Sequence, residues 1–258
     1  MTFTQRVLAA TVLALALAGH AHAGATLEAV KARGTLLVGT TGDYKPFTFR
    51  NPDGTYVGAD IDMARRLAAR LGVTATFVPT AWGRMMDDFA AGRFDIAMGG
   101  ITNLPPRAER GLFSRTVYVD GKRPIARCAD RTRFSSIAAI DQPDVRVVVN
   151  PGASNEEFAR KNFPDAKLTV HADNATVFDE IVAGREDVMV TDGIEVDHQA
   201  FIHKELCAAE MPAPFTHLEK AYWMQKDPDF AREVGTWLDA EIASGAWRQT
   251  LDAALKSP

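Results

Sequence analysis

Two similar heptapeptides, GRFDIAM at residues 92–98 and GREDVMV at residues 184–190, decide the fold. Each begins with a glycine that suits the end of a helix, and each finishes in an apolar run typical of a buried strand. Each also closes a β-α-β-α-β series. This repetition predicts two similar α/β lobes.

The two series can be followed along the chain from their apolar periodicity. The first has predicted strands at 36–40, 74–78 and 95–98, helices at 60–72 and 82–91, and a turn at 51–54. The second has predicted strands at 145–149, 167–170 and 187–190, one helix beginning at Ser154 and another at 174–183. Such alternation favours a mainly parallel sheet in each lobe, with ligands bound beyond the carboxyl ends of the strands.

The remaining segments fit a hinge and a final helical region. Residues 113–125 are expected to run as an extended connection into the second lobe, and 220–224 as a returning strand. Asp227 and Pro228 suit the first positions of a C-terminal helix, whose spaced aromatics are expected in the core. The predicted boundaries are therefore 24–119 and 218–258 for lobe 1 and 120–217 for lobe 2.

The first 23 residues have the pattern of a cleavable signal peptide. Arg6 precedes an apolar run at 7–18, and Ala21-His22-Ala23 forms a small-residue cleavage motif. The apolar run is shorter than the roughly 18 residues that a membrane helix needs, and no later segment reaches that length. We therefore expect a periplasmic protein with no membrane span. Its net charge of −4 argues against nucleic acid as a partner.

Cys128 and Cys207 are the two cysteines of the chain. In an exported protein they are expected to form a disulfide, and two unrelated buried thiols are the alternative. Two cysteines alone make no metal site, and the six histidines contain no His-x-x-x-His pair. The sequence therefore predicts no metal site.

The stretch VMVTDGIE at 188–195 allows two interpretations. Taken alone, it predicts a turn at Asp192-Gly193 and a solvated Glu195 in the first turn of the next helix. In a two-lobed fold, however, the strand ends at 99–102 and 191–193 face each other across a cleft. Glu195 would then border the ligand.

Several motifs support a family resemblance that covers essentially all of the chain after residue 23. TGDYKPFTF at 41–49, FDIAMGGIT at 94–102 and an Arg before Phe113-Ser114 resemble the bilobed periplasmic receptors for polar amino acids. Within that superfamily, IDQPDV, VVNPG, TDGIE and EKAY are more similar to the cyclohexadienyl dehydratases. The resemblance implies a two-lobed, type II periplasmic-binding-protein-like α/β fold with a ligand cleft between the lobes.

The resemblance also implies a reaction. Cyclohexadienyl dehydratases convert prephenate to phenylpyruvate and arogenate to phenylalanine, with loss of water and carbon dioxide and without a cofactor. The alternative is a non-catalytic amino-acid receptor of an ABC importer, which would return its ligand unchanged. The resemblance leaves open whether the protein forms a homo-oligomer.

The site residues implied by the resemblance come from both lobes. Glu195 takes the place of the general acid. The substrate-binding residues are Tyr44, Trp82, Gly99, Thr102, Arg107, Asn150, Ser154 and Asp192. Arg107 is expected to clamp a carboxylate, the helix start at Ser154 to seat an anion, and the two aromatics to sandwich the ring. Gly99 and Ala153 depart from the family, where Ser and Gly are expected.

Overall fold

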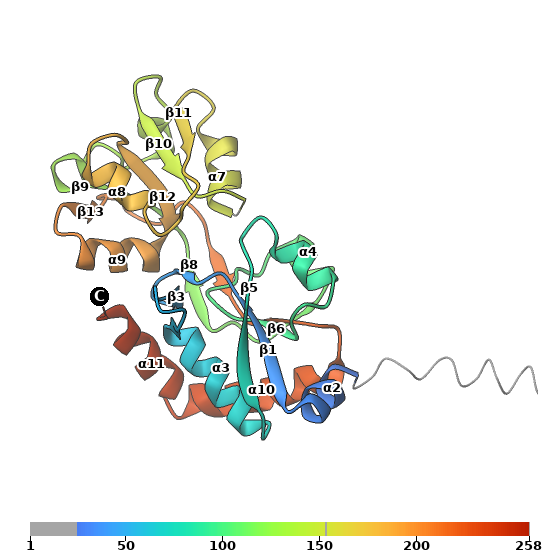
Figure 1. The fold of residues 1–258 in the computed structure, drawn as a ribbon. Helices are drawn as coiled ribbons and strands as arrows, with labels where there is room; N and C mark the ends of the chain where they lie inside the picture. The colour runs from blue at the N-terminus through green and yellow to red at the C-terminus, as the bar shows by residue number, and fades with distance from the viewer. Residues whose placement is uncertain (1–24, 153, 258) are drawn as a thin grey trace, which may run out of the picture.

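The computed structural model describes residues 25–152 and 154–257. Two α/β lobes lie one above the other in Figure 1, each with its own five-stranded sheet. The predicted signal peptide and Ala153 lie outside the described residues. Within the described part of the chain, no helix is long and apolar enough to cross a membrane.

Lobe 1 is built on a sheet that is parallel at one edge. Its strand order is β5 (Thr74–Pro79), β1 (Thr35–Thr40), β6 (Ile96–Ala97), β15 (Trp223–Met224) and β7 (Leu112–Phe113). β1 runs parallel to β5 and β6, whereas β15 runs antiparallel to both of its neighbours. A small sheet of β2 (Asp43–Tyr44), β3 (Thr48–Arg50) and β4 (Tyr56–Val57) holds the predicted turn at 51–54.

Six helices belong to lobe 1 in the described chain. They are α2 (Ala25–Arg33), α3 (Ala59–Arg70), α4 (Met85–Ala90), α10 (Pro228–Ala243) and α11 (Ala246–Leu255), with the single turn α5 (Pro105–Ala108) before the cleft. The predicted N-cap at Asp227 is confirmed, because its side chain accepts hydrogen bonds from the backbone of Asp229 and Phe230. α4 starts three residues later than predicted, so Trp82 lies in a turn facing the cleft.

Lobe 2 has the strand order β11 (Lys167–Val170), β10 (Arg146–Val149), β12 (Val188–Asp192), β9 (Lys122–Arg127) and β13 (Leu206–Ala208). Its helices are α6 (Ile137–Ile140), α7 (Ser154–Asn162), α8 (Val177–Val182) and α9 (Gly193–Ile202), and a 3-10 turn spans Cys128–Asp130. The expected extended connection at 113–125 into the second lobe is confirmed, whereas the strand pairing within it was not predicted. That stretch includes the start of β9, which is buried in the sheet antiparallel to β12.

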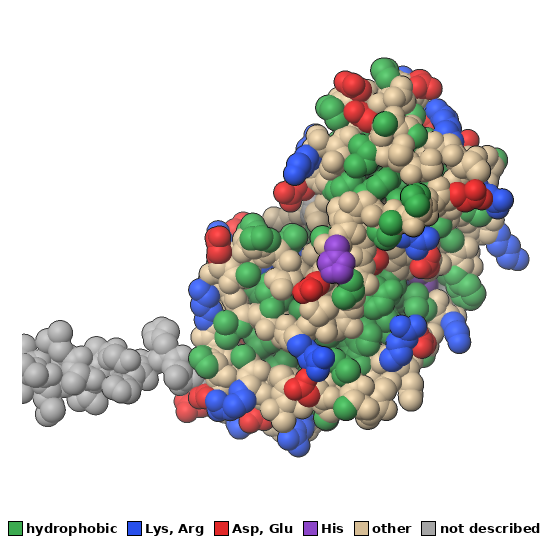
Figure 2. Space-filling model, turned by 180° about the vertical axis from the view of Figure 1, so that it is seen from behind, with side chains coloured by type: hydrophobic (Ala, Val, Ile, Leu, Met, Phe, Trp, Pro, Cys, Tyr) green, Lys and Arg blue, Asp and Glu red, His purple; other side chains and the backbone are tan. Residues whose placement is uncertain are grey.

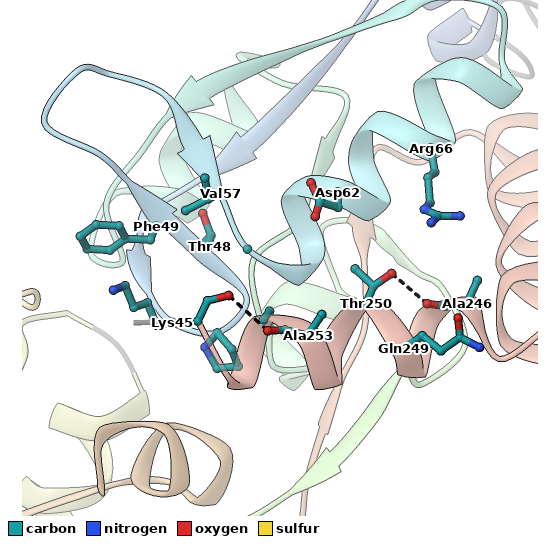
Figure 3. Close-up of a pocket in the computed structure, with 14 residues that line it drawn as sticks. Lys45, Thr48, Phe49, Val57, Asp62, Arg66, Ala246, Gln249, Thr250 and Ala253 are labelled. Atoms are coloured by element: carbon teal, nitrogen blue, oxygen red, sulfur yellow. Dashed lines mark hydrogen bonds between the residues drawn. The ribbon is translucent and has the colours of Figure 1, made fainter. Parts of the chain in front are cut away.

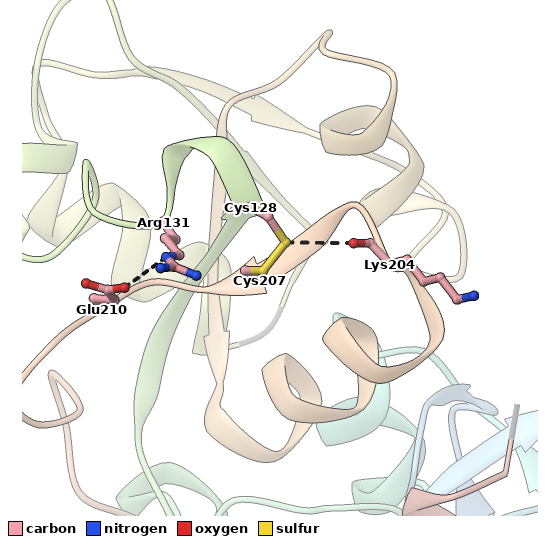
Figure 4. The surroundings of a disulfide bond; sticks show 5 residues. All are labelled: Cys128, Arg131, Lys204, Cys207 and Glu210. Carbon is pink, nitrogen blue, oxygen red and sulfur yellow. Dashed lines mark hydrogen bonds and ion pairs between the residues drawn. A yellow bond between two sulfur atoms is a disulfide. The ribbon is translucent and has the colours of Figure 1, made fainter.

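The predicted disulfide between Cys128 and Cys207 is present, with Cα atoms 4.7 Å apart (Figure 4). It links the residue after β9 to the edge strand β13, so it lies within lobe 2. Two antiparallel hinge strands, β8 (Tyr118–Asp120) and β14 (Leu218–Lys220), run between the lobes. The lobe boundaries predicted at 119/120 and 217/218 fall on or beside these strands and stay predictions.

The packing of α9 ties the lobes together. Ile194, at the start of this lobe 2 helix, is 1% exposed and belongs to the apolar cluster of lobe 1.

Acidic and basic side chains are interspersed over the face drawn in Figure 2.

Candidate functional site

A narrow cavity lies where the strand ends of the two lobes meet. The free volume of the cavity is only about 20 Å³, so a substrate needs the lobes to part. The lining consists of Tyr44, Trp82, Gly100, Thr102, Arg107, Asn150, Ser154, Asn155, Asn174, Asp192, Glu195 and Lys220. All the predicted site residues except Gly99 are among them.

Asp192 is the last residue of β12 and is surrounded by donors. Its Oδ1 accepts a 2.8 Å hydrogen bond from Lys122 Nζ, and its Oδ2 accepts one of 2.6 Å from Tyr44 and a further one from Lys220 Nζ. The two ammonium groups outweigh burial and hold the pKa of Asp192 well below its usual range. Asp192 is therefore an ionised carboxylate neutralised by the protein's own cations.

Glu195 lies in the first turn of α9 and is 2% exposed. The interpretation of Glu195 as a solvated helix-start charge is therefore wrong. Burial raises the pKa of Glu195 to about 8, a donated hydrogen bond from Thr191 opposes that rise, and the nearby charge of Asp192 adds to it. A carboxyl group with this pKa carries its proton at neutral pH.

A chain of polar side chains surrounds the acid. Lys122 donates to the Oγ of Ser154 at 3.1 Å and to the Oδ1 of Asn155. The Asn155 amide nitrogen donates in turn to Asn150 at 2.9 Å and to the Thr191 hydroxyl at 3.0 Å. Because the Thr191 oxygen already accepts from Asn155, its one proton is available to Glu195. The start of α7 is thus joined to the acid.

Arg107 reaches the cavity from the single turn α5. Its Nη1 donates a 2.9 Å hydrogen bond to the carbonyl of Thr102, and its side chain is nearly buried. Burial lowers the pKa of Arg107 to about 10, which leaves the guanidinium charged at neutral pH. No ion pair within residues 25–152 and 154–257 includes Arg107. A buried guanidinium without an anionic partner is suited to bind a carboxylate from the ligand.

The two aromatic side chains line the cavity but contact one another. The rings of Tyr44 and Trp82 have centroids 5.7 Å apart and an interplanar angle of 80°, which is an edge-to-face pair. The expectation that the two rings sandwich the ring of a ligand stays a prediction. Asp43 accepts a 3.0 Å hydrogen bond from Trp82 Nε1 and so holds that ring.

Gly99 lies one residue away from the lining, and Gly100 takes the place at the cavity wall. A Cβ atom on Gly99 would come within 2.9 Å of the Thr48 methyl group and 3.0 Å of the Thr40 hydroxyl. Gly99 also has φ of 143°, which disfavours a side chain. Its difference from the family therefore concerns packing beneath the site.

Sequence reasoning missed Lys122, Lys220, Asn155 and Asn174 as site residues. Lys122 begins β9 and Lys220 ends β14, and both are about 1% exposed. The sequence did contain a signal for the two lysines. Each lies in a segment that was predicted to pass between the lobes, and such a segment runs beside the cleft. Asn155 adjoins the predicted anion seat.

A wider groove lies elsewhere on lobe 1, between β3, α3 and α11 (Figure 3). Lys45, Asp62 and Arg66 line it together with small and apolar side chains. It contains none of the residues that surround Glu195, so the candidate site is the cleft.

Residues 36–256 match the model of the bacterial extracellular solute-binding proteins, family 3. The chain belongs to this family. A family relative, the cyclohexadienyl dehydratase of Pseudomonas aeruginosa, is 46% identical over 237 residues, which cover 89% of this chain and 88% of the relative. The L-cystine-binding protein TcyJ of Escherichia coli is 31% identical over 64% of this chain and 62% of its own length.

Solved structures of ancestral proteins match the family 3 fold of this chain. An ancestral amino acid-binding protein, described as a precursor of cyclohexadienyl dehydratase, has 34% identity and a TM-score of 0.82 over 90% of this chain and 100% of its own. An ancestral cyclohexadienyl dehydratase has 47% identity and a TM-score of 0.56 over 90% of this chain and 96% of its own. The two-lobed fold predicted from the sequence is therefore confirmed.

Proposed function

We propose that this protein is a periplasmic cyclohexadienyl dehydratase, which converts prephenate to phenylpyruvate and arogenate to phenylalanine. The observation that carries the proposal is a buried carboxyl group, Glu195, with a pKa raised to about 8 inside a cleft rich in cations. The identity of 46% with a cyclohexadienyl dehydratase supports it. The periplasmic location rests on the signal-peptide pattern at 1–23 and on the extracellular family.

Glu195 supplies the proton that the reaction needs. The ring hydroxyl leaves as water when Glu195 protonates its oxygen and the C–O bond breaks. The bond from the ring to its carboxylate breaks at the same time, its electron pair enters the ring, and carbon dioxide leaves. The ring becomes aromatic, and the Glu195 carboxylate regains a proton from water. Burial suits this role because it favours the neutral acid.

The charge balance of the cleft fits a substrate with two carboxylates. Arg107, Lys122 and Lys220 bring three positive charges, whereas Asp192 brings one negative charge and a protonated Glu195 brings none. Arg107 binds one substrate carboxylate through its unpaired guanidinium. The Ser154 hydroxyl, at the start of α7, accepts from Lys122 and keeps its own proton to donate to the other carboxylate.

A receptor for zwitterionic amino acids would need an available anion for the ligand's ammonium group. Asp192 has the right place but already accepts hydrogen bonds from Tyr44, Lys122 and Lys220. Glu195 is uncharged at neutral pH. The cleft therefore favours prephenate, which has no ammonium group, over an amino-acid ligand of a receptor, and arogenate must displace one of the present donors of Asp192.

The direct experiment incubates the purified protein with prephenate and follows the enol of phenylpyruvate under alkali. The proposal predicts product that increases with time and with protein concentration. Prephenate that is bound and recovered unchanged at micromolar protein would instead support the receptor. Arogenate, with phenylalanine as the measured product, tests the second substrate in the same way.

A further inference from the structure

Asn174 belongs to lobe 2 and reaches across the cleft from the loop before α8. Its Nδ2 donates a 2.9 Å hydrogen bond to the backbone carbonyl of Asp43 in lobe 1. A carbonyl oxygen only accepts hydrogen bonds, so the amide nitrogen must face Asp43. The orientation of the Asn174 amide is thereby fixed, with Oδ1 on the side away from that carbonyl.

The Oδ1 atom of Asn174 is buried and has no hydrogen-bond partner among the described residues. The residue is 8% exposed and lines the same narrow cavity as Glu195, and also an adjoining cavity beside Ala81 and Gly152. A buried acceptor without a donor is costly, and such atoms are few in folded proteins. An acceptor left open in the wall of a ligand cavity is therefore suited to a hydrogen that the ligand donates.

The surroundings of Asn174 place it on the same side of the site as the acid. Asp43 lies directly against Asn174, and its carboxylate holds Trp82 through a 3.0 Å hydrogen bond. Asp43 is also close enough to Glu195 for its charge to help raise the pKa of that acid. Because Asn174 and Glu195 line the same narrow cavity, one ligand can contact both.

We propose that Asn174 Oδ1 accepts the hydrogen of the substrate's ring hydroxyl while Glu195 protonates the oxygen of the same hydroxyl. This inference rests on the proposed function. The hydroxyl has one hydrogen to donate and lone pairs to accept with, and the two side chains match both. When the C–O bond breaks, the oxygen leaves as water with its own hydrogen and the proton from Glu195. Asn174 therefore neither receives nor donates a proton.

This arrangement gives Asn174 a specific task. A hydroxyl group on a ring rotates freely about its C–O bond, and a hydrogen bond to Asn174 would stop that rotation with a lone pair directed at Glu195. Asn174 would then bind the departing group in addition to joining the lobes through Asp43. The two tasks predict different effects on different ligands.

The test compares a ligand that has the hydroxyl with one that lacks it. Dissociation constants for prephenate and for phenylpyruvate are measured by calorimetry in a Glu195→Gln background, which prevents turnover, with and without Asn174→Ala. Loss of the lobe contact weakens both ligands equally. Loss of the acceptor for the hydroxyl raises the dissociation constant of prephenate alone, by a factor of roughly 5 to 100 beyond the effect on phenylpyruvate. Asn162→Ala is the matched control, because the Asn162 amide likewise donates to a backbone carbonyl, that of Phe158 in its own lobe, and lies outside the cavity.

Equal weakening of the two ligands by Asn174→Ala would overturn the inference. Asn174→Ser serves as a second variant if the alanine variant does not fold. The ratio of the dissociation constants of prephenate and phenylpyruvate is then compared in the same way. Turnover of prephenate by the parent protein is measured separately. Its absence contradicts the proposed function, whereas turnover with equal weakening contradicts only the role of Asn174.

Discussion

The Tyr44 hydroxyl in lobe 1 donates a 2.6 Å hydrogen bond to Asp192 Oδ2 in lobe 2, and the same carboxylate accepts hydrogen bonds from Lys122 and Lys220. Asp192 is thus an internal counter-ion at the point where the lobes meet. A carboxylate that is fully occupied in this way cannot also bind the ammonium group of a ligand without losing one of its present donors.

Lys220→Met is expected to change substrate preference, because it leaves Asp192 with one ammonium partner fewer. We expect kcat/KM for prephenate to fall, whereas the ammonium group of arogenate replaces the lost positive charge beside Asp192. The ratio of kcat/KM for arogenate to kcat/KM for prephenate should therefore rise by roughly tenfold or more. Lys226→Met, which changes an exposed lysine, is the control. An unchanged ratio in Lys220→Met would show that Asp192 does not face the side chain of the substrate, where arogenate has an ammonium group and prephenate a keto group.

Arg107→Ala is expected to weaken substrate binding by at least ~2 kcal/mol, because a charge-assisted pair is lost and a substrate carboxylate is left without its partner. The measurement is KM for prephenate, supported by a direct binding constant. Arg110→Ala removes an exposed arginine three residues away and should have little effect. A parental KM in Arg107→Ala would exclude Arg107 as the anchor.

The raised pKa of Glu195 predicts a defined dependence on pH. The folded-state pKa of about 8 lies above the ordinary glutamate pKa of 4.5, so the folded protein holds this proton more tightly than the unfolded chain. The stability gained from it is fully present below pH 4.5 and is lost as the pH rises through about 8. Activity should fall over the same upper range, because the acid loses its proton. Profiles of kcat/KM and of the free energy of unfolding from pH 5 to 9 test this, and Glu195→Gln should lack the fall in stability.

Cys128→Ser is expected to lower stability by roughly 2 to 4 kcal/mol and to spare the chemistry. The disulfide joins β13 to the end of β9 within lobe 2, and neither cysteine lines the cleft. Thermal unfolding should shift downward, while kcat/KM for prephenate at 25 °C should stay within about twofold of the parent, because no group at the site changes. A large loss of activity in folded Cys128→Ser protein would mean that the bridge positions α9 and its acid.

Much of the architecture could be predicted because periodic apolar patterns and glycine helix ends are local signals. The strand at 167–170 and the N-cap at Asp227 are confirmed for this reason. The antiparallel entry of β9 could not be predicted, because strand neighbours are set by long-range packing. Burial of the lysines beside Asp192 likewise depends on a counter-ion 70 and 28 residues away in the chain.

The site was partly predictable for the same reason. Asp192 ends β12 and Glu195 lies in the first turn of the next helix, which is a local signal, and the closed cleft brings them together with Arg107 and Tyr44. The open Oδ1 of Asn174 could not be read from sequence, because it follows from the contact between its Nδ2 and a carbonyl of the other lobe. The edge-to-face angle of Tyr44 and Trp82 also depends on how the lobes close.

The most direct test of the account is the rate of prephenate turnover by Glu195→Gln, since Gln keeps the size and polarity of the side chain and removes the transferable proton. Asp197→Asn, a change of an exposed carboxylate on the same helix, is the matched control and should keep the parental rate. The account predicts that kcat of Glu195→Gln falls by roughly 10² to 10⁴ while prephenate still binds about as well as to the parent. A folded Glu195→Gln protein with the parental kcat would contradict the central claim and remove Glu195 from the mechanism.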